Sequence, residues 1–215
     1  MLIAININDA VFVMQLPFIH LNLCFNPFGE LTAQQRINLA VVDLEGLQSV
    51  LYEQAIAIQF YADHGRGKTT HLLSLHQLYP KVEYIKLHSG ERPEIQPRSI
   101  RFVDSIENLP GRKRLNLYRK TASIALTTHT DLTKELNRAG YRVINRHVST
   151  VDNETLLKIF NSRIEYARRG AGAIPVVDMC AIGSLKSLFG DDIRAMEACL
   201  YDRVQNMKGV DNVKV

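Results

Sequence analysis

Apolar residues along the chain follow two patterns: short continuous runs, and longer segments in which they recur at helical spacing. The short runs predict strands at 55–61, 82–88, 99–104, 123–129 and 141–148. The longer segments predict helices at 33–54, 71–79, 111–120, 133–140 and 150–169, with two more at about 176–189 and 191–207. Because strands that alternate with helices form βαβ units, we expect an α/β fold. It should have three layers around a mainly parallel five-stranded sheet, followed by a short C-terminal helical cap.

The same pattern divides the chain into an N-terminal extension at 1–25, a core at 26–170 and a short helical lid fragment at 171–215. Polar residues interrupt the apolar opening segment, which also has no basic start, so neither a membrane span nor a signal peptide is expected. Residues 1–13 fit either an additional β-like segment or a start placed too far upstream. Thr150 or Asp152 is the expected N-cap of the long helix that follows the fifth strand.

Composition narrows the class of protein. The chain is 46% hydrophobic and 22% charged, which is typical of globular proteins and excludes a disordered chain or a fibre. The net charge of +4 permits an anionic ligand without requiring nucleic acid. Cys24, Cys180 and Cys199 are widely spaced and form no C-x-x-C pair, so we expect buried thiols in a reducing, cytoplasmic compartment.

The segment ADHGRGKTT at 62–70 lies between a predicted strand and a predicted helix, which is the setting that a phosphate-binding loop requires. Glycines let the loop curl so that its N–H groups converge beside the positive end of the helix. Lys68 would place its ammonium on the β- and γ-phosphates of a nucleoside triphosphate, and Thr69 would offer its hydroxyl to Mg²⁺. The candidate nucleotide-binding residues are Asp63, His64, Gly65, Arg66, Gly67, Lys68, Thr69 and Thr70.

This loop departs from G-x-x-x-x-G-K-[ST] at one position, where Ala62 replaces the first glycine. Alanine adopts ordinary backbone angles, so we expect the loop to form with a small adjustment. The alternative interpretation is a surface turn with a solvated lysine.

Mg²⁺ in such a site needs a carboxylate at the end of a neighbouring strand, and the strand 99–104 ends with Asp104. Thr69 and Asp104 are therefore the candidate metal ligands; the alternative for Asp104 is a turn cap. The next residue is Ser105, which cannot accept a proton from an attacking water as a carboxylate does. Glu107 is the nearest carboxylate that could, so the chain either hydrolyses nucleotide or binds it with little or no hydrolysis.

Thr127, Thr128 and His129 end the fourth strand, a position beside the γ-phosphate in folds of this kind. A hydroxyl or imidazole there could sense the phosphate; the alternative is a set of polar groups satisfied by the strand end. His64 and His129 lack a further ligand at metal-like spacing, which disfavours a metal site on them.

In the order of these motifs the chain resembles the AAA+ superfamily of P-loop ATPases, which commonly carry G-x-x-G-x-G-K-T where this sequence reads ADHGRGKT. More narrowly, it is similar to the single-domain ATPases that assist secretion-system assembly or transposition. NPFGELT at 26–32 is similar to their Pro-Phe start, and VDSIENLP at 103–110 to their Asp-Glu-x-x-x-Leu strand end, with Ser105 where glutamate is usual. The resemblance covers about residues 26–207.

The resemblance implies a P-loop NTPase fold that uses ATP and Mg²⁺ as cofactors. It implies that Thr128 is the first sensor and that Arg194, in GDDIRAMEACL, points to the γ-phosphate. With Lys68 and Glu107, these complete the candidate catalytic residues. Relatives of this kind often form rings in which a neighbouring subunit contributes an arginine, for which Arg138 and then Arg142 are the candidates; the alternative for either is a solvated surface arginine.

The segment GRKRLNLYRK at 111–120 is strongly basic and predicts either a DNA-contacting helix or a solvated face. Two functions therefore compete. In the first, the chain is a Mg²⁺-dependent ATPase that acts on a protein or DNA partner and can form a homo-oligomer. In the second, bound nucleotide controls a binding module that hydrolyses little or none of it. A GTPase is a weaker alternative because no N-K-x-D motif is present. A small-molecule kinase is a further alternative, although the sequence contains no recognisable acceptor site.

Overall fold

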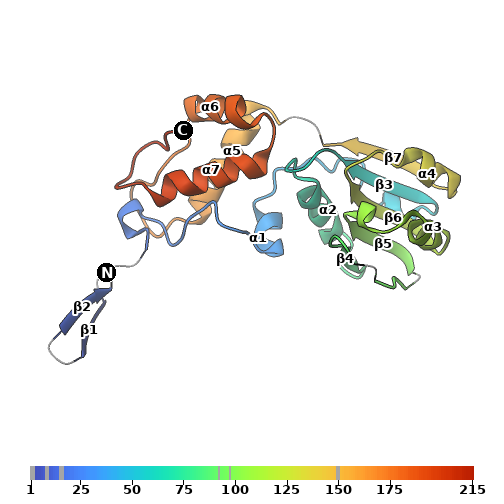
Figure 1. Ribbon diagram of the computed structural model, residues 1–215, viewed down its shortest axis with the longest axis horizontal. Helices are drawn as coiled ribbons and strands as arrows, with labels where there is room; N and C mark the ends of the chain where they lie inside the picture. The colour runs from blue at the N-terminus through green and yellow to red at the C-terminus, as the bar shows by residue number, and fades with distance from the viewer. Residues whose placement is uncertain (1–2, 8–9, 15–16, 92, 97, 149–150) are drawn as a thin grey trace. The chain divides into compact units, whose positions relative to one another are not determined.

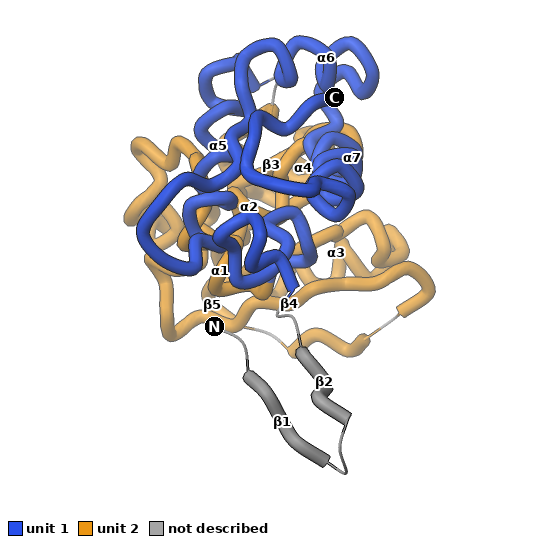
Figure 2. The backbone as a smooth tube through the Cα atoms, turned by 90° about the vertical axis from the view of Figure 1, so that its left-hand side faces the viewer, with its two compact units in different colours: residues 1–31, 151–215 blue, residues 32–150 orange. Residues whose placement is uncertain are grey.

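The computed structural model describes residues 3–7, 10–14, 17–91, 93–96, 98–148 and 151–215. The chain forms two compact units (Figure 2), one of residues 32–150 and the other of residues 1–31 with 151–215. The candidate cap Thr150 lies outside the described residues.

A five-stranded parallel sheet forms the centre of the unit of residues 32–150, in the order β4-β5-β6-β3-β7 (Figure 1). The strands are β3 (Ile56–Tyr61), β4 (Tyr84–Lys86), β5 (Arg98–Asp104), β6 (Thr121–Thr128) and β7 (Arg142–His147). All five lie where the apolar runs predict them, and the sheet is parallel throughout, which confirms the predicted fold class. Because the strands are parallel, their carboxyl ends share one edge of the sheet.

Helices cover both faces of this sheet. The helices are α1 (Ala33–Asn38), α2 (Lys68–Gln77), α3 (Gly111–Arg119) and α4 (Thr133–Arg138). On β3, Ile58 and Phe60 enter a core with Leu72 and Leu75 of α2, whereas Ala57 enters a second core. That second core includes Leu117 and Tyr118 of α3 and Leu136 of α4. Burial on both faces explains why the strands read as continuous apolar runs rather than as an alternation.

The helix predicted at 33–54 is wrong over most of its length. Only α1, which begins with a capping box between Thr32 and Gln35, and a single 3₁₀ turn at Val50–Tyr52 are helical. Between them the Asp43 side chain accepts the Glu45 N–H at 2.8 Å, and Gly46 has φ +76°. α1 has already ended at Asn38, and this local turn with its left-handed glycine is incompatible with a helix that continues to residue 54. The apolar residues of the segment that suggested a helix pack irregularly against the sheet.

The other unit contains α5 (Asn153–Tyr166), α6 (Met179–Phe189) and α7 (Ile193–Gln205), which share one apolar core with residues 17–31. Each helix begins with an aspartate whose side chain accepts a backbone N–H of the first turn; for α5 this cap is Asp152. A 3₁₀ turn at Ile19–Leu21 belongs to the same unit, as does an antiparallel pair of strands, β1 (Ile3–Ile7) and β2 (Ala10–Met14).

A buried arginine holds the NPFG turn in this unit. Arg163 of α5 is 4% exposed, and its Nε and Nη2 donate to the carbonyl oxygens of Pro27 at 2.8 Å and Gly29 at 2.6 Å. Its Nη1 forms an ion pair with Glu197 of α7. The segment that resembles a Pro-Phe start is thus fixed by a buried guanidinium that bonds through each of its three nitrogens.

The prediction of buried thiols is wrong for two of the three cysteines. Cys24 and Cys180 are exposed, and Cys199 is half-buried; all three are free thiols. Leu23 next to Cys24 pairs with Arg168 and is fully buried, so the extended backbone turns Cys24 outward. α6 buries Ala181, Ile182 and Leu185, which leaves Cys180 off its buried stripe. Among the described residues, no helix has both the length and the apolar character that crossing a bilayer requires.

Candidate functional site

The loop at 62–67 joins the end of β3 to the start of α2, as the motif predicts. Its left-handed positions are Gly65 at φ +74° and Gly67 at φ +86°, and Gly67 is the N-cap residue of α2. Positive φ is the conformation that glycine adopts at no steric cost. Ala62 is 5% exposed and is not one of the residues with positive φ, so the missing first glycine does not prevent the curl of the loop.

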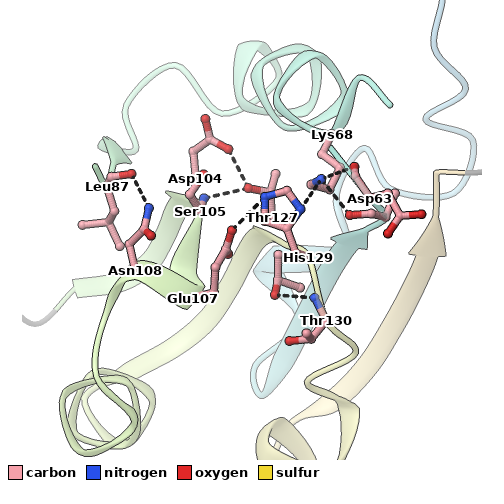
Figure 3. A network of polar contacts seen from close by, with 12 residues as sticks. Asp63, Lys68, Leu87, Asp104, Ser105, Glu107, Asn108, Thr127, His129 and Thr130 are labelled. Carbon is pink, nitrogen blue, oxygen red and sulfur yellow. Dashed lines mark hydrogen bonds and ion pairs between the residues drawn. The ribbon is translucent and has the colours of Figure 1, made fainter. Parts of the chain in front are cut away.

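Lys68 is the first residue of α2, and its side chain turns back into the loop (Figure 3). Its Nζ donates to the carbonyl oxygens of Ala62 at 2.7 Å and Asp63 at 2.6 Å, and lies 3.1 Å from Nδ1 of His129. With only 9% of the residue exposed, this ammonium is held at the mouth of the loop rather than extended into solvent. The geometry does not match the alternative of a solvated lysine.

The strand order explains which residues meet this loop. β6 lies between β3 and β5, so the end of β6 separates the loop that follows β3 from Asp104 at the end of β5. Asp104 is 1% exposed, and the Thr69 hydroxyl donates to its carboxylate at 3.1–3.2 Å. The Thr127 hydroxyl of β6 lies 2.5 Å from the same carboxylate and donates to it. The structure thus brings Thr69 and Asp104 together as oxygen groups of the kind that could hold Mg²⁺.

Ser105, directly after Asp104, has φ +61° and ψ +52°, which is left-handed for a non-glycine residue. Its N–H donates to the Thr127 hydroxyl at 2.7 Å. This backbone turn starts the short 3₁₀ segment Ile106–Asn108, whose central residue is Glu107. The turn therefore directs Glu107 back toward the end of β6.

Glu107 and His129 face each other there, with Oε1 and Nε2 3.3 Å apart. The second oxygen of Glu107 is buried and has no hydrogen-bond partner among the residues that the structure describes. The ring of His64 from the loop lies against His129, with ring centroids 3.7 Å apart. Burial raises the pKa of Glu107. Burial, the Lys68 ammonium and His64 lower the pKa of His129, which favours a neutral imidazole. Because the Lys68 ammonium can only donate, Nδ1 of that neutral imidazole accepts and Nε2 carries the proton.

The other predicted site residues lie at varying distances from this cluster. Asp63 and His64 are exposed on the loop, and Arg66, Thr69 and Thr70 are half-buried. Thr128 is fully buried, and its hydroxyl accepts the Thr130 N–H at 3.2 Å. That Thr128 senses the γ-phosphate stays a prediction.

The candidate arginines lie on elements other than those that carry the cluster around Lys68. Arg194 belongs to the first turn of α7, in the other unit, and is exposed. Arg138 is exposed in the last turn of α4. Arg142 begins β7, at the edge of the sheet opposite the loop, and pairs with Glu53.

The sequence pattern does not predict the series of contacts that runs from Lys68 through His129 to Glu107.

The pattern also does not predict a role for Gln59, a fully buried polar residue in the apolar strand β3. The Gln59 amide donates to Asp131 at 2.9 Å and to Asn145 at 2.8 Å, and its carbonyl accepts the Leu132 N–H at 2.7 Å. A polar residue inside an apolar strand was the signal that could have identified it.

Within the part of the chain that the structure describes, no three His, Cys, Asp or Glu side chains come together as a metal site. No protein-family model matches the sequence, and a comparison with curated proteins finds no match.

Solved structures do match the fold. Domain III of the replication initiation protein DnaA from Thermotoga maritima superposes with a TM-score of 0.55 at 14% identity, covering 81% of this chain and 91% of that one. NtrX from Brucella abortus, in complex with ADP, superposes with a TM-score of 0.50 at 14% identity, covering 82% of this chain and 54% of that one.

This chain has the three-layer α/β fold of P-loop NTPases, with a five-stranded parallel sheet. It spans about half of the NtrX chain, and at this level of identity the likeness shows the fold alone. The P-loop NTPase fold predicted from the motif order is thus confirmed. The narrower likeness to ATPases of secretion-system assembly or transposition stays a prediction.

Proposed function

We propose that this chain is a cytoplasmic, ATP-binding AAA+-type domain that depends on Mg²⁺ and uses its nucleotide state to act on a partner. The observation that carries the proposal is the meeting of Lys68, Thr69 and Asp104 at one edge of the sheet, around a loop with two left-handed glycines. Lys68 and Thr69 belong to the loop motif that follows β3, whereas Asp104 ends β5, and the parallel sheet brings the ends of these two strands to one edge.

Each group has a defined part in nucleotide binding. The N–H groups of the loop and the start of α2 would hold the phosphates, where the partial positive charge of the helix end favours anions. The Lys68 ammonium would leave the carbonyl oxygens of Ala62 and Asp63 for the β- and γ-phosphates. Thr69 and Asp104 would hold Mg²⁺, which supplies charge neutralisation of the triphosphate when bound.

The test of this proposal is the Lys68→Ala variant in titration calorimetry with Mg²⁺ and ATP. ATP affinity should fall about 10- to 100-fold, because a hydrogen bond to a charged group contributes roughly 1.5–3 kcal/mol. Lys81→Ala, at an exposed position before β4, is the matched control and should bind as the native chain does. Equal affinity in the Lys68→Ala variant contradicts the proposal.

Ser105 favours the second candidate function, a nucleotide-gated module with little hydrolysis. It occupies the position after Asp104 and offers no carboxylate to an attacking water. Turnover by the Ser105→Glu variant separates the two candidates: a large gain in rate over the native chain supports the gated module. If the native chain already hydrolyses ATP and the Ser105→Glu variant does so at the same or a lower rate, the result supports the ATPase.

The surface of α3 is the best-supported partner site. Arg112, Lys113, Arg119 and Lys120 are exposed there, whereas Arg114 is engaged by Glu135. DNA bound by this helix should lose affinity with rising salt, and Arg112→Ala with Arg119→Ala should reduce the salt slope by about 1 for each phosphate contact removed. A flat salt profile in the native chain rules out DNA as the partner of α3 and leaves a protein partner. Ring assembly, with Arg138 completing a neighbouring site, belongs to the same proposal and is tested by the oligomeric state with ATP.

A further inference from the structure

An unbroken series of polar contacts connects the phosphate loop to the segment that follows β5. It runs from Nζ of Lys68 to Nδ1 of His129 at 3.1 Å, and from Nε2 of His129 to Oε1 of Glu107 at 3.3 Å (Figure 3). The three residues come from α2, the residue after β6, and the 3₁₀ turn after Asp104. Imidazole is thus flanked by an ammonium on one nitrogen and a carboxylate on the other.

We propose that His129, oriented by Glu107, is the proton acceptor for the water that attacks the γ-phosphate, in the position where Ser105 provides no carboxylate. This inference rests on the proposed function, since it names the base of the same ATP site. His129 would be the catalytic residue, and Glu107 a positioning residue that acts through it.

The location of His129 supports this role. Its Nδ1 contacts the ammonium that, in the proposed function, holds the γ-phosphate, so the nitrogen lies one side chain away from the reacting group. The His129 side chain is 28% exposed, which leaves a path for water. Once Lys68 turns to the phosphates, Nδ1 presents a free lone pair to that water.

Other bases near the loop are less suited. Asp104 is 1% exposed, accepts from Thr69 and Thr127, and in the proposed function faces Mg²⁺, so it is not the group that meets the attacking water. Glu107 directs Oε1 at the imidazole rather than at the loop. A carboxylate that holds one imidazole nitrogen fixes the tautomer and stabilises the imidazolium, as in other pairs of this type. The lowered pKa of His129 keeps the ring neutral and able to accept a proton at neutral pH.

The chemical step balances without a further reactant. The water oxygen forms a bond to the γ-phosphorus while the bond from that phosphorus to the bridging oxygen breaks, and ADP leaves with the electron pair. The water proton passes to Nδ1 of His129, and the imidazolium is stabilised by the Glu107 carboxylate. Release of that proton to solvent restores the neutral ring.

A purely structural role for His129, holding Lys68 in the loop, is the competing explanation. The His129→Asn variant separates the two, because the asparagine amide oxygen lies near the place of Nδ1 and can still accept from Lys68. It cannot take up the proton of the water. Glu107→Gln is the second variant, since the amide keeps the size of the side chain but not its charge.

The experiment measures ATP affinity by calorimetry and single-turnover hydrolysis on the full chain with Mg²⁺. We expect His129→Asn to keep its affinity within about threefold while the hydrolysis rate falls about 100-fold, the range for loss of a general base. Glu107→Gln should lose about 10-fold in rate, again with affinity kept. His147→Gln, an exposed histidine at the end of neighbouring β7, is the matched control and should leave both unchanged.

A second readout is independent of activity. Nitrogen NMR of the histidine rings in the nucleotide-free chain should find His129 neutral with its proton on Nε2, and Glu107→Gln should shift the His129 signals. The opposite tautomer overturns the proposal, and so does native turnover that His129→Asn leaves unchanged, or ATP binding by the native chain without turnover. Each of these results leaves the proposed ATP-binding function standing, whereas absence of ATP binding removes both.

Discussion

Two residues with positive φ determine the backbone turns of the candidate site, one before α2 and one after β5. Gly67 begins α2 at φ +86°, and Ser105 turns the chain after Asp104 at φ +61°. A serine in this conformation carries a cost of about 1–2 kcal/mol that glycine does not. The turn at Ser105 also brings its N–H to the Thr127 hydroxyl, which in turn donates to Asp104. Single backbone conformations thus set the distances among the polar groups of the site.

Alanine in place of Gly67 should destabilise the protein, and the cost should come from backbone conformation alone. No atom lies within 4 Å of the Cβ that alanine would add, so space is not limiting. We expect a loss of about 1–2 kcal/mol, measured as a lower denaturation midpoint. Gly183→Ala inside α6, where the Cβ also meets open space, should instead stabilise by about 0.5–1 kcal/mol. The same sign for both variants contradicts the argument from φ.

At the scale of elements, α3 and α4 are connected by a bidentate ion pair. Arg114 donates from Nε and Nη2 to the two oxygens of Glu135, each at 2.8 Å. This contact joins two helices of one sheet face. It also takes Arg114 out of the basic surface of α3, so four cations of that helix, and not five, are exposed to a partner.

The pH dependence of stability should report this pair. The hydrogen bond and charge of Arg114 lower the pKa of Glu135 below its ordinary value of 4.5. The pair therefore stabilises the fold above about pH 4.5, and this contribution is lost as the pH falls through the lowered pKa of the folded state. Glu135→Gln should lower the midpoint of thermal unfolding at pH 7. The difference in midpoint between this variant and the native chain should become smaller in acid. Glu94→Gln, at an exposed position, should show no such pH-dependent gap.

At the scale of the whole molecule, the candidate residues are divided between the two units. Lys68, Thr69, Asp104 and Glu107 belong to the unit of residues 32–150, whereas Arg194 is on α7 of the other. The contact of Arg194 with the γ-phosphate that the resemblance implies stays a prediction, and a substitution of this arginine tests it.

Arg194→Ala should weaken ATP binding about 10-fold if this arginine contacts the γ-phosphate, as expected for loss of a hydrogen bond between charged groups. Arg203→Ala is the control on the same helix, where the arginine is also exposed. Titration calorimetry of the two variants under identical salt gives the comparison. Equal affinity for both variants and the native chain would identify Arg194 as a solvated surface residue.

Local signals in the sequence were enough for the strands and the loop. The five predicted runs became the five strands; β3 and β6 are buried along most of their length, and a strand buried on both faces needs mostly apolar residues. The glycines and lysine of the loop were recognisable because backbone curl and phosphate binding need these residue types at fixed spacing. The helix predicted at 33–54 failed because apolar spacing alone cannot distinguish a helix from an irregular segment that covers a sheet.

The sequence by itself therefore determined the kind of fold, the position of the phosphate loop and the carboxylate at the end of β5. Only the tertiary structure decided that β6 lies between β3 and β5, and this placement brings His129 between Lys68 and Glu107. Strand order depends on how apolar faces are buried across the whole sheet, and no short stretch of residues encodes it. A contact between residues 61 positions apart in the chain, such as that of Lys68 with His129, exists only once the sheet has assembled.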